Sequence, residues 1–178
     1  MVQQLLGLAP QDLVTVDGQG DEAVADWARL NTPETYLRYE RTGNFASPGG
    51  VGLGEVRAYA APDRLRLNQW ALSGDWTMER ECVSLNAAGG RVFVRFQARD
   101  VHLVLRRTGQ DEPVPFRVRL DGKGPGAAHG VDTNPDGNGH LDEDRLYQLV
   151  RQPGAVEERT FEITFHEGGV EAYVFTFG

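Results

Sequence analysis

The sequence RVFVRF at residues 91–96 places Val92, Val94 and Phe96 on one side of an extended chain and both arginines on the other. The same alternation returns in FRVRL at 116–120, TFEITF at 160–165 and VEAYVFTF at 170–177. Successive side chains of a strand point to opposite faces, so a period of two indicates half-buried strands. With no long helical pattern between them, these segments predict an all-β fold, an antiparallel jelly-roll-like β-sandwich.

Weaker alternation elsewhere brings the prediction to about nine or ten strands, a number typical of a jelly roll. Further strands are expected at 35–39, 57–59, 65–72, 76–85, 101–105 and 146–150. Ser73-Gly74-Asp75 is expected to form a turn, residues 121–144 a long polar loop, and residues 166–169 a hairpin joining the last two strands.

The size and composition of the chain fit one domain with an extension. It has 178 residues, of which 40% are hydrophobic. Residues 1–31 lack the strand pattern and contain a short predicted helix at 21–30, so they are predicted to be an N-terminal extension or linker. Residues 32–178 are predicted to form the β-sandwich.

The charge balance and the cysteine content restrict the function. With 18 basic and 26 acidic residues, the chain is a poor partner for nucleic acid, which requires a basic surface. No stretch approaches the ~20 apolar residues of a membrane helix, so no membrane insertion by this chain is expected. Cys82 is the single cysteine; it is interpreted as a small apolar strand residue, and paired carboxylates such as Glu79 and Glu81 as solvated groups.

Several motifs occur in an order that resembles one known module. They are TPETYL at 32–37, NFASP at 44–48, LNQWALSGDW at 67–76, FQARDVHLV at 96–104, VRLDG at 118–122 and AYVFTFG at 172–178. Together they resemble the C-terminal module of DipZ-like proteins and related thioredoxin-fold fusions, over about residues 13–178.

The resemblance implies a β-sandwich similar to carbohydrate-binding modules, placed after a thioredoxin-like domain. It implies that upstream domain as a partner, and an extracytoplasmic location if the parent is DipZ-like or a cytoplasmic one otherwise. The chain lacks the CxxC motif of the thioredoxin domain, so the redox activity of the family is not assigned to these residues.

A polar stretch at 132–143 nearly matches a calcium-binding loop. Oxygen-bearing side chains alternate along it, a glycine occupies loop position 6, and a glutamate occupies position 12. The predicted Ca²⁺ ligands are Asp132, Asn134, Asp136, Asn138 and Glu143. The alternative is a hairpin tip in which Asx and glycine residues serve the backbone conformation, because position 8 is Gly139 and neither flank resembles a helix.

Aromatic side chains beside polar ones provide candidates for a glycan-binding surface. A flat ring can stack on the C–H face of a sugar while neighbouring amides or guanidinium groups bond its hydroxyls. The candidates are Tyr36, Arg38, Asn68, Trp70, Trp76 and Tyr147. Large aromatics in strands mostly fill cores; Trp70 is expected in the core, whereas Trp76, after a polar turn, is expected to be more exposed.

No catalytic residues are predicted. There is no nucleophile elbow, and no glycine-rich loop stands between a strand and a helix. Together with the resemblance, which implies an accessory domain of a thiol-disulfide oxidoreductase, this absence favours a non-catalytic domain that binds carbohydrate or docks substrate. The alternatives are a purely structural or oligomerisation module, and a glycan-active jelly-roll enzyme.

Overall fold

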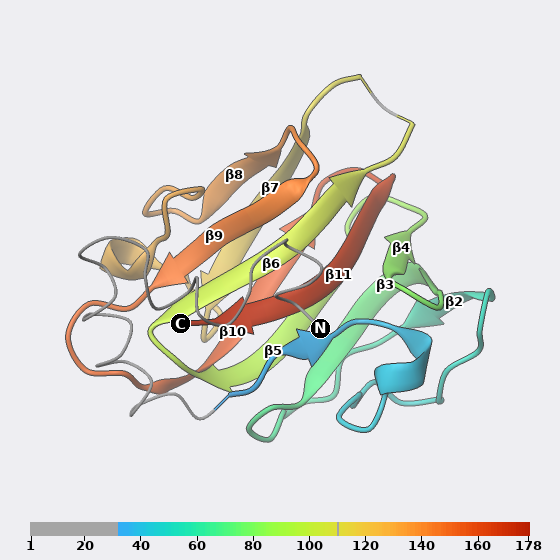
Figure 1. Ribbon diagram of the computed structural model, residues 1–178, viewed down its shortest axis with the longest axis horizontal. Helices are drawn as coiled ribbons and strands as arrows, with labels where there is room; N and C mark the ends of the chain where they lie inside the picture. The colour runs from blue at the N-terminus through green and yellow to red at the C-terminus, as the bar shows by residue number, and fades with distance from the viewer. Residues whose placement is uncertain (1–31, 110) are drawn as a thin grey trace, which may run out of the picture.

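The computed structural model describes residues 32–109 and 111–178, which form an antiparallel sheet of eleven strands (Figure 1). The strands are β1 (Thr35–Tyr36), β2 (Val56–Tyr59), β3 (Trp70–Met78), β4 (Val83–Leu85), β5 (Arg91–Gln97), β6 (Asp100–Arg107), β7 (Val114–Leu120), β8 (Asn138–Leu141), β9 (Arg145–Arg151), β10 (Glu158–Phe165) and β11 (Val170–Phe177). Two short 3-10 helices accompany them, η2 (Tyr39–Arg41) and η3 (Gly126–Ala128). The predicted all-β, antiparallel fold class is confirmed.

The strands form two layers. Sheet A has the order β3-β4-β11-β6-β9, with β2 paired to β3 and β1 paired to β11. Sheet B has the order β8-β7-β10-β5-β3. Figure 1 shows β9, β6 and β11 side by side in the front layer, with β10 behind them. Every named strand pair is antiparallel.

Strand β3 belongs to both sheets. Its first part, Trp70–Ser73, pairs with β5 in sheet B, and Trp76–Met78 pairs with β4 in sheet A. Between them Gly74 has a φ of 100°, and a Cβ there would lie 2.9 Å from the Cα of Gly90. Only glycine fits such a close approach at positive φ.

The turn predicted at Ser73-Gly74-Asp75 is therefore wrong. The strand bends at Gly74 as it passes from one sheet to the other, and the chain reverses only after Met78. There the backbone N–H of Glu79 donates to the carbonyl of Cys82 at 2.8 Å.

The last two strands do not form the predicted hairpin either. Strand β10 pairs with β5 and β7 in sheet B, whereas β11 pairs with β1, β4 and β6 in sheet A. Residues 166–169 connect the two layers. The predicted loop at 121–144 also contains η3 and β8, and β8 pairs with β7.

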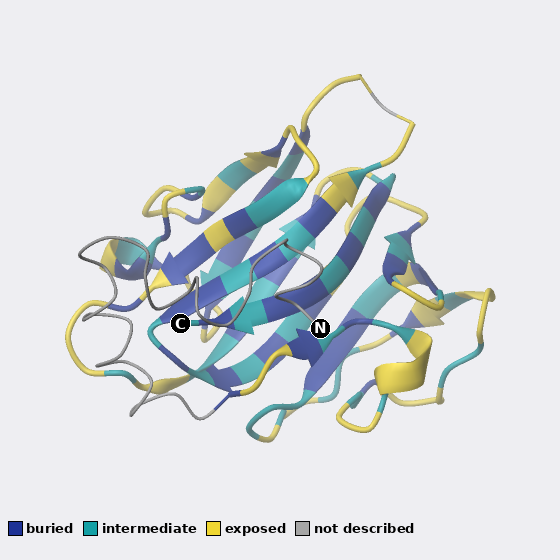
Figure 2. Ribbon diagram, viewed as in Figure 1, coloured by how far each residue is buried: buried dark blue, intermediate teal, exposed yellow. Residues whose placement is uncertain are grey.

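Alternating side chains from both sheets form one core. Along β5, Val92, Val94 and Phe96 are fully buried, as their spacing predicts. Figure 2 shows the same alternation of buried and more exposed positions along β6 and β11. The largest fully buried side chains include Trp70, Trp76, Tyr147, Phe96, Phe116, Phe161, Phe165 and Phe175. Each such side chain contributes about 1.5–3 kcal/mol by leaving water.

The predicted extension at residues 1–31, with its helix at 21–30, lies outside the described residues. Among the residues that are described, no helix has the length and apolar character needed to cross a membrane.

Candidate binding cleft

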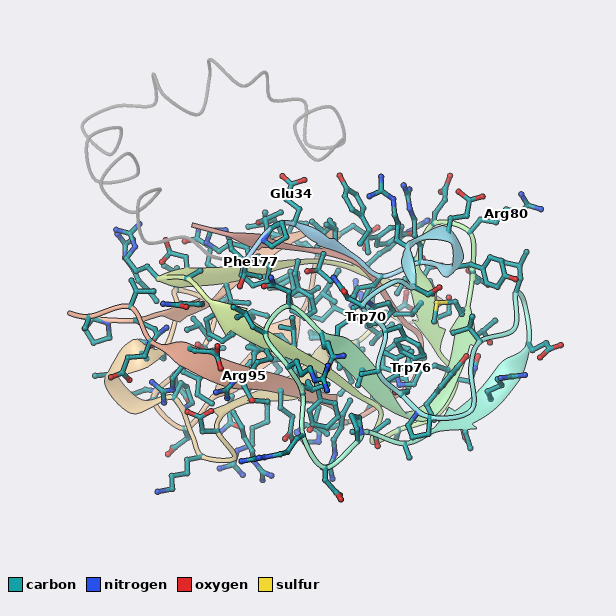
Figure 3. All side chains as sticks on the ribbon, turned by 90° about the horizontal axis from the view of Figure 1, so that it is seen from below. Glu34, Trp70, Trp76, Arg80, Arg95 and Phe177 are labelled. Atoms are coloured by element: carbon teal, nitrogen blue, oxygen red, sulfur yellow. The ribbon has the colours of Figure 1, made fainter. Side chains whose placement is uncertain are left out.

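An open cleft of about 430 Å³ lies on the outer face of sheet A, around the turn between β3 and β4. We call it the β4–β11 cleft. Its lining residues are Leu53, Gly54, Glu79, Arg80, Glu81, Cys82, Arg106, Glu171 and Tyr173. Figure 3 shows one of them, Arg80, projecting from the edge of the molecule, whereas Trp70 and Trp76 lie inside.

The strand register brings the polar side chains of the cleft together. Glu171 on β11 lies opposite Ser84 on β4 and opposite Arg106 on β6. The neighbours of these residues along each strand, such as Val83 and Ala172, point into the core. Because side chains alternate along a strand, Ser84, Arg106 and Glu171 face outward in one row. Cys82 shares the side of Ser84.

Hydrogen bonds connect the residues of the cleft. The Cys82 thiol lies 3.5 Å from Glu79 Oε2 and 3.7 Å from Glu171 Oε2. Ser84 Oγ donates to Glu79 Oε2 at 3.2 Å, and the Tyr173 hydroxyl donates to Glu171 Oε1 at 3.1 Å. The two carboxylates are thus tied to the thiol and hydroxyl groups beside them.

Of the two carboxylates beside Cys82, Glu171 forms an ion pair within the described residues and Glu79 does not. Arg106 Nη1 lies 3.7 Å from Glu171 Oε1. Within the described residues, no arginine, lysine or histidine forms an ion pair with the Glu79 carboxylate.

Burial changes the acid–base properties of two groups here. It raises the pKa of the Cys82 thiol to about 12; the hydrogen bond with Ser84 opposes this change, and the charges of Glu171 and Glu79 add to it. Burial also raises the pKa of Tyr173 to about 12, against a hydrogen bond with Arg106. Both groups are therefore protonated at neutral pH, and the Tyr173 hydroxyl is a hydrogen-bond donor.

Two of the residues predicted from the sequence to bind a ligand lie beside this cleft. Tyr36 on β1 pairs with Val174 on β11, and the following backbone N–H, that of Leu37, donates to the carbonyl of Tyr173 at 2.9 Å. The Arg38 guanidinium lies 4.9 Å from the centre of the half-buried Tyr36 ring.

The other four predicted glycan-binding residues lie elsewhere. Trp70, Trp76 and Tyr147 are at most 1% exposed and belong to the core. The greater exposure expected for Trp76 is wrong, because β3 continues through Gly74 and keeps the alternation that turns Trp76 inward. Asn68 precedes β3, and its backbone N–H donates to the carbonyl of Arg95 at 2.7 Å, on the side of sheet B.

The predicted calcium ligands lie in the loop before β8, within β8 and just after it. Both carboxylate oxygens of Asp132 accept hydrogen bonds from Arg145, at 3.0 and 3.1 Å, and one also accepts from the backbone N–H of Gln148 at 2.7 Å. Asn134 Oδ1 accepts from the backbone N–H of Asn138 at 2.9 Å.

The remaining two predicted calcium ligands, like Asn134 and Asn138, are exposed. Asp136 is exposed, and the side chain of Glu143 is 75% exposed. Hydrogen bonds from Arg145 and Gln148 of β9 to Asp132, and one from Asn138 to Asn134, hold this loop in place. A calcium ion would have to displace Arg145 from Asp132, and the calcium site stays a prediction.

The residues of the β4–β11 cleft form a site that the sequence does not predict. Glu79, interpreted from the sequence as a solvated carboxylate, is half-buried and bonded to Ser84. Cys82 is buried, at 3% exposure, and its thiol lies against the carboxylates of Glu79 and Glu171. The apolar surroundings expected from the sequence are therefore incomplete on this side. Cys82 and Ser84 are two positions apart, and so are Glu171 and Tyr173, so each pair lies on one face of its strand. This spacing is the signal in the sequence that could have indicated the site.

A known family covers the part of the chain that the structure describes. The family model of the thioredoxin-like C-terminal domain matches residues 32–178. The chain belongs to the thioredoxin-like C-terminal domain family. No curated protein matches its sequence. Membership supports an accessory domain of a thioredoxin-like protein, as the resemblance implied. This thioredoxin-like C-terminal domain has Cys82 as its single cysteine, so it contains no CxxC pair.

A second, smaller pocket of about 170 Å³ lies over β6 and β9 and includes His102, His129 and Gln148. The ring of His102 is half-buried, and its Nδ1 lies 3.4 Å from Thr176 Oγ1. Burial lowers the pKa of His102, and the charges of Arg151 and Arg99 act in the same direction, while Asp100 opposes them.

His102 makes the stability of the domain sensitive to acid. Because its folded pKa lies below the unfolded value of about 6.5, the unfolded chain binds more protons below that pH. His102 therefore leaves the free energy of unfolding unchanged above about pH 6.5, and lowers it as the pH drops toward the folded pKa of His102. When the pH is lowered from about 7.5 to about 5.5, the free energy of unfolding should fall less for His102→Gln than for the wild type. Urea unfolding at both pH values measures this difference. The exposed His166→Gln variant is the control and should follow the wild type; equal acid sensitivity in all three proteins would contradict the prediction.

Proposed function

We propose that this domain is a non-catalytic binding domain of a DipZ-type thioredoxin-like protein, and that it holds carbohydrate in the β4–β11 cleft. The thiol-disulfide chemistry would belong to a thioredoxin-like domain of the parent, which makes that domain the natural partner. A DipZ-type parent would place the domain outside the cytoplasmic membrane.

The observation that carries the proposal is the grouping of Tyr173, Glu171 and Arg106 at the cleft. A carboxylate and a guanidinium together offer the acceptors and donors that sugar hydroxyls require. The Tyr173 ring supplies apolar surface, and its hydroxyl is fixed by Glu171. The volume of about 430 Å³ lies within the usual range for small-molecule sites, about 300–1,000 Å³.

The pair of Tyr36 and Arg38 could extend the site along β11. These residues approach Tyr173 through the pairing of β1 with β11. An oligosaccharide lying across β11 would then meet two tyrosines and two arginines. This arrangement replaces the tryptophan surface expected from the sequence, because both tryptophans are in the core.

The proposal is tested with a glycan array probed with the purified 178-residue chain, followed by calorimetry on the best ligand. Glu171→Gln and Tyr173→Ala should each weaken binding by about 10-fold to 100-fold, the loss expected when a hydrogen bond to a charged group, about 1.5–3 kcal/mol, is removed.

Glu158→Gln is the matched control, since Glu158 is also a strand glutamate paired with an arginine, Arg95, but lies in sheet B. It should leave the affinity unchanged. Absence of any glycan binding would overturn the proposal in favour of a structural or docking module. Binding that both cleft substitutions leave unchanged would overturn the β4–β11 cleft as the carbohydrate site.

A further inference from the structure

Three potential metal ligands meet at the floor of the β4–β11 cleft. One oxygen of Glu79, the sulfur of Cys82 and one oxygen of Glu171 lie within 4.8 Å of one another. They come from the β3–β4 turn and from β11, and Ser84 Oγ lies 3.8 Å from the sulfur. We propose that this constellation is a zinc site, with a fourth coordination position open to the cleft.

The spacing of the three donor atoms suits tetrahedral coordination. Zn²⁺ binds sulfur at about 2.3 Å and carboxylate oxygen at about 2.0–2.2 Å, so a tetrahedral angle separates the two donors by about 3.5 Å. The sulfur lies 3.5 Å from Glu79 Oε2 and 3.7 Å from Glu171 Oε2. Both sulfur–oxygen distances therefore match tetrahedral coordination, and the two carboxylate oxygens, which lie within 4.8 Å of each other, would close around one ion by side-chain rotation.

The identity of the donors selects the metal. Calcium and magnesium take six or more oxygen ligands, so a site with one sulfur and two carboxylates does not suit them. Thiolate sulfur favours zinc among the common divalent ions, and carboxylate oxygen also binds zinc.

The site carries more negative than positive charge, which favours the binding of a cation. Two carboxylates lie against the thiol of the buried Cys82, and Arg106 provides one positive charge at 3.7 Å from Glu171. A divalent ion that displaces the thiol proton brings the sum of the thiolate, the two carboxylates, Arg106 and the metal to zero. The ion would thereby offset the repulsion between the two carboxylates that lie on either side of Cys82.

Binding would follow a balanced exchange. The S–H bond of Cys82 breaks, its electron pair forms the Zn–S bond, and the proton passes to solvent. Water or a ligand group in the cleft would complete the coordination. Since zinc binds without any sugar, the site does not depend on the proposed carbohydrate function.

The test uses the full 178-residue chain, freed of metal with a chelator and titrated with Zn²⁺ by calorimetry. We expect one ion per chain and, from titrations in buffers of different ionisation enthalpy, release of about one proton. With Co²⁺ in place of Zn²⁺, a thiolate-to-cobalt charge-transfer band should appear in the near ultraviolet and saturate at one equivalent.

Matched variants locate the site. Cys82→Ala should abolish the charge-transfer band, and Glu171→Gln should weaken zinc by at least about tenfold, because loss of even an outer-shell partner costs about 10–100-fold. Glu81→Gln is the control: Glu81 lines the same cleft but is exposed and lies outside the constellation.

Two results would overturn the proposal. One is the absence of saturable binding to the wild-type chain. The other is zinc binding that survives Cys82→Ala or falls equally in Glu81→Gln, which would indicate a diffuse acidic surface. Circular dichroism of each variant separates loss of the site from loss of the fold.

Discussion

Replacing Trp76 with alanine is expected to lower the free energy of unfolding by about 3–5 kcal/mol, the usual cost of removing a buried tryptophan. The Trp76 side chain is fully buried, its ring packs edge-on to Phe165 at 6.3 Å between centres, and its Nε1 donates to the carbonyl of Ser73 at 2.9 Å. Alanine would leave a cavity between the sheets and remove the hydrogen bond from Trp76 Nε1 to Ser73 at the bend of β3.

Urea unfolding measures this loss. Val131→Ala is the control, because Val131 is 80% exposed and should change stability by less than about 0.5 kcal/mol. A loss below about 1 kcal/mol for Trp76→Ala would contradict the burial of Trp76 and favour the exposed position expected from the sequence.

Gly137→Ala is expected to cost about 3 kcal/mol or more. Gly137 has a φ of 92°, and a Cβ there would overlap the carbonyl oxygen of Val118 on β7. The backbone N–H of Val118 also donates to the carbonyl of Gly137 at 2.7 Å, so the two residues are held close together. Alanine thus combines a strained backbone with overpacking that typically costs about 1–3 kcal/mol.

Gly89→Ala separates these two costs. Gly89 has a similar φ of 88°, but nothing lies within 4 Å of the position that an added methyl group would take. It should lose only the backbone contribution, about 1 kcal/mol. Urea unfolding in the presence of a chelator makes the comparison independent of calcium. Equal losses in the two variants would contradict the packing explanation, and a loss for Gly137→Ala that appears only with calcium would favour the predicted metal loop.

The alternation of residues predicts most strands correctly because it depends on one physical quantity, burial of every second side chain. It does not give the partners of a strand. The motifs at 160–165 and 170–177 look like two halves of a hairpin, yet β10 and β11 lie in different layers. Nothing in the four intervening residues distinguishes a reversal within a sheet from a crossing between sheets.

Gly74 illustrates a second limit of the sequence. Glycine next to aspartate is typical of turns, and the same pair suits a strand that bends from one sheet into another. Only the approach of Gly90 decides between them. Once the strand is continuous, Trp76 must follow Trp70 and Leu72 into the core, which removes both tryptophans from any surface site.

The cleft depends on the same missing information. Cys82 and Glu171 are separated by 89 residues, and they meet because β4 pairs with β11. The sequence does provide Tyr36 and Arg38, which lie beside the cleft, through their position in an alternating segment. It favours the Asx-rich loop as a metal site because that pattern is local, whereas the proposed zinc site combines the β3–β4 turn with a residue of β11 that lies 89 positions away from Cys82.

The passage of β3 through both layers also affects how the domain can open. Breaking the ladder between β3 and β4 in sheet A disturbs the strand that β5 needs in sheet B. The sandwich therefore cannot separate into two independent halves, and partial opening would begin at its loops and at the edge strands β8 and β9, each of which pairs with one other strand. A protease that attacks transiently opened molecules would cut these parts and leave the strands around β3 paired in both layers.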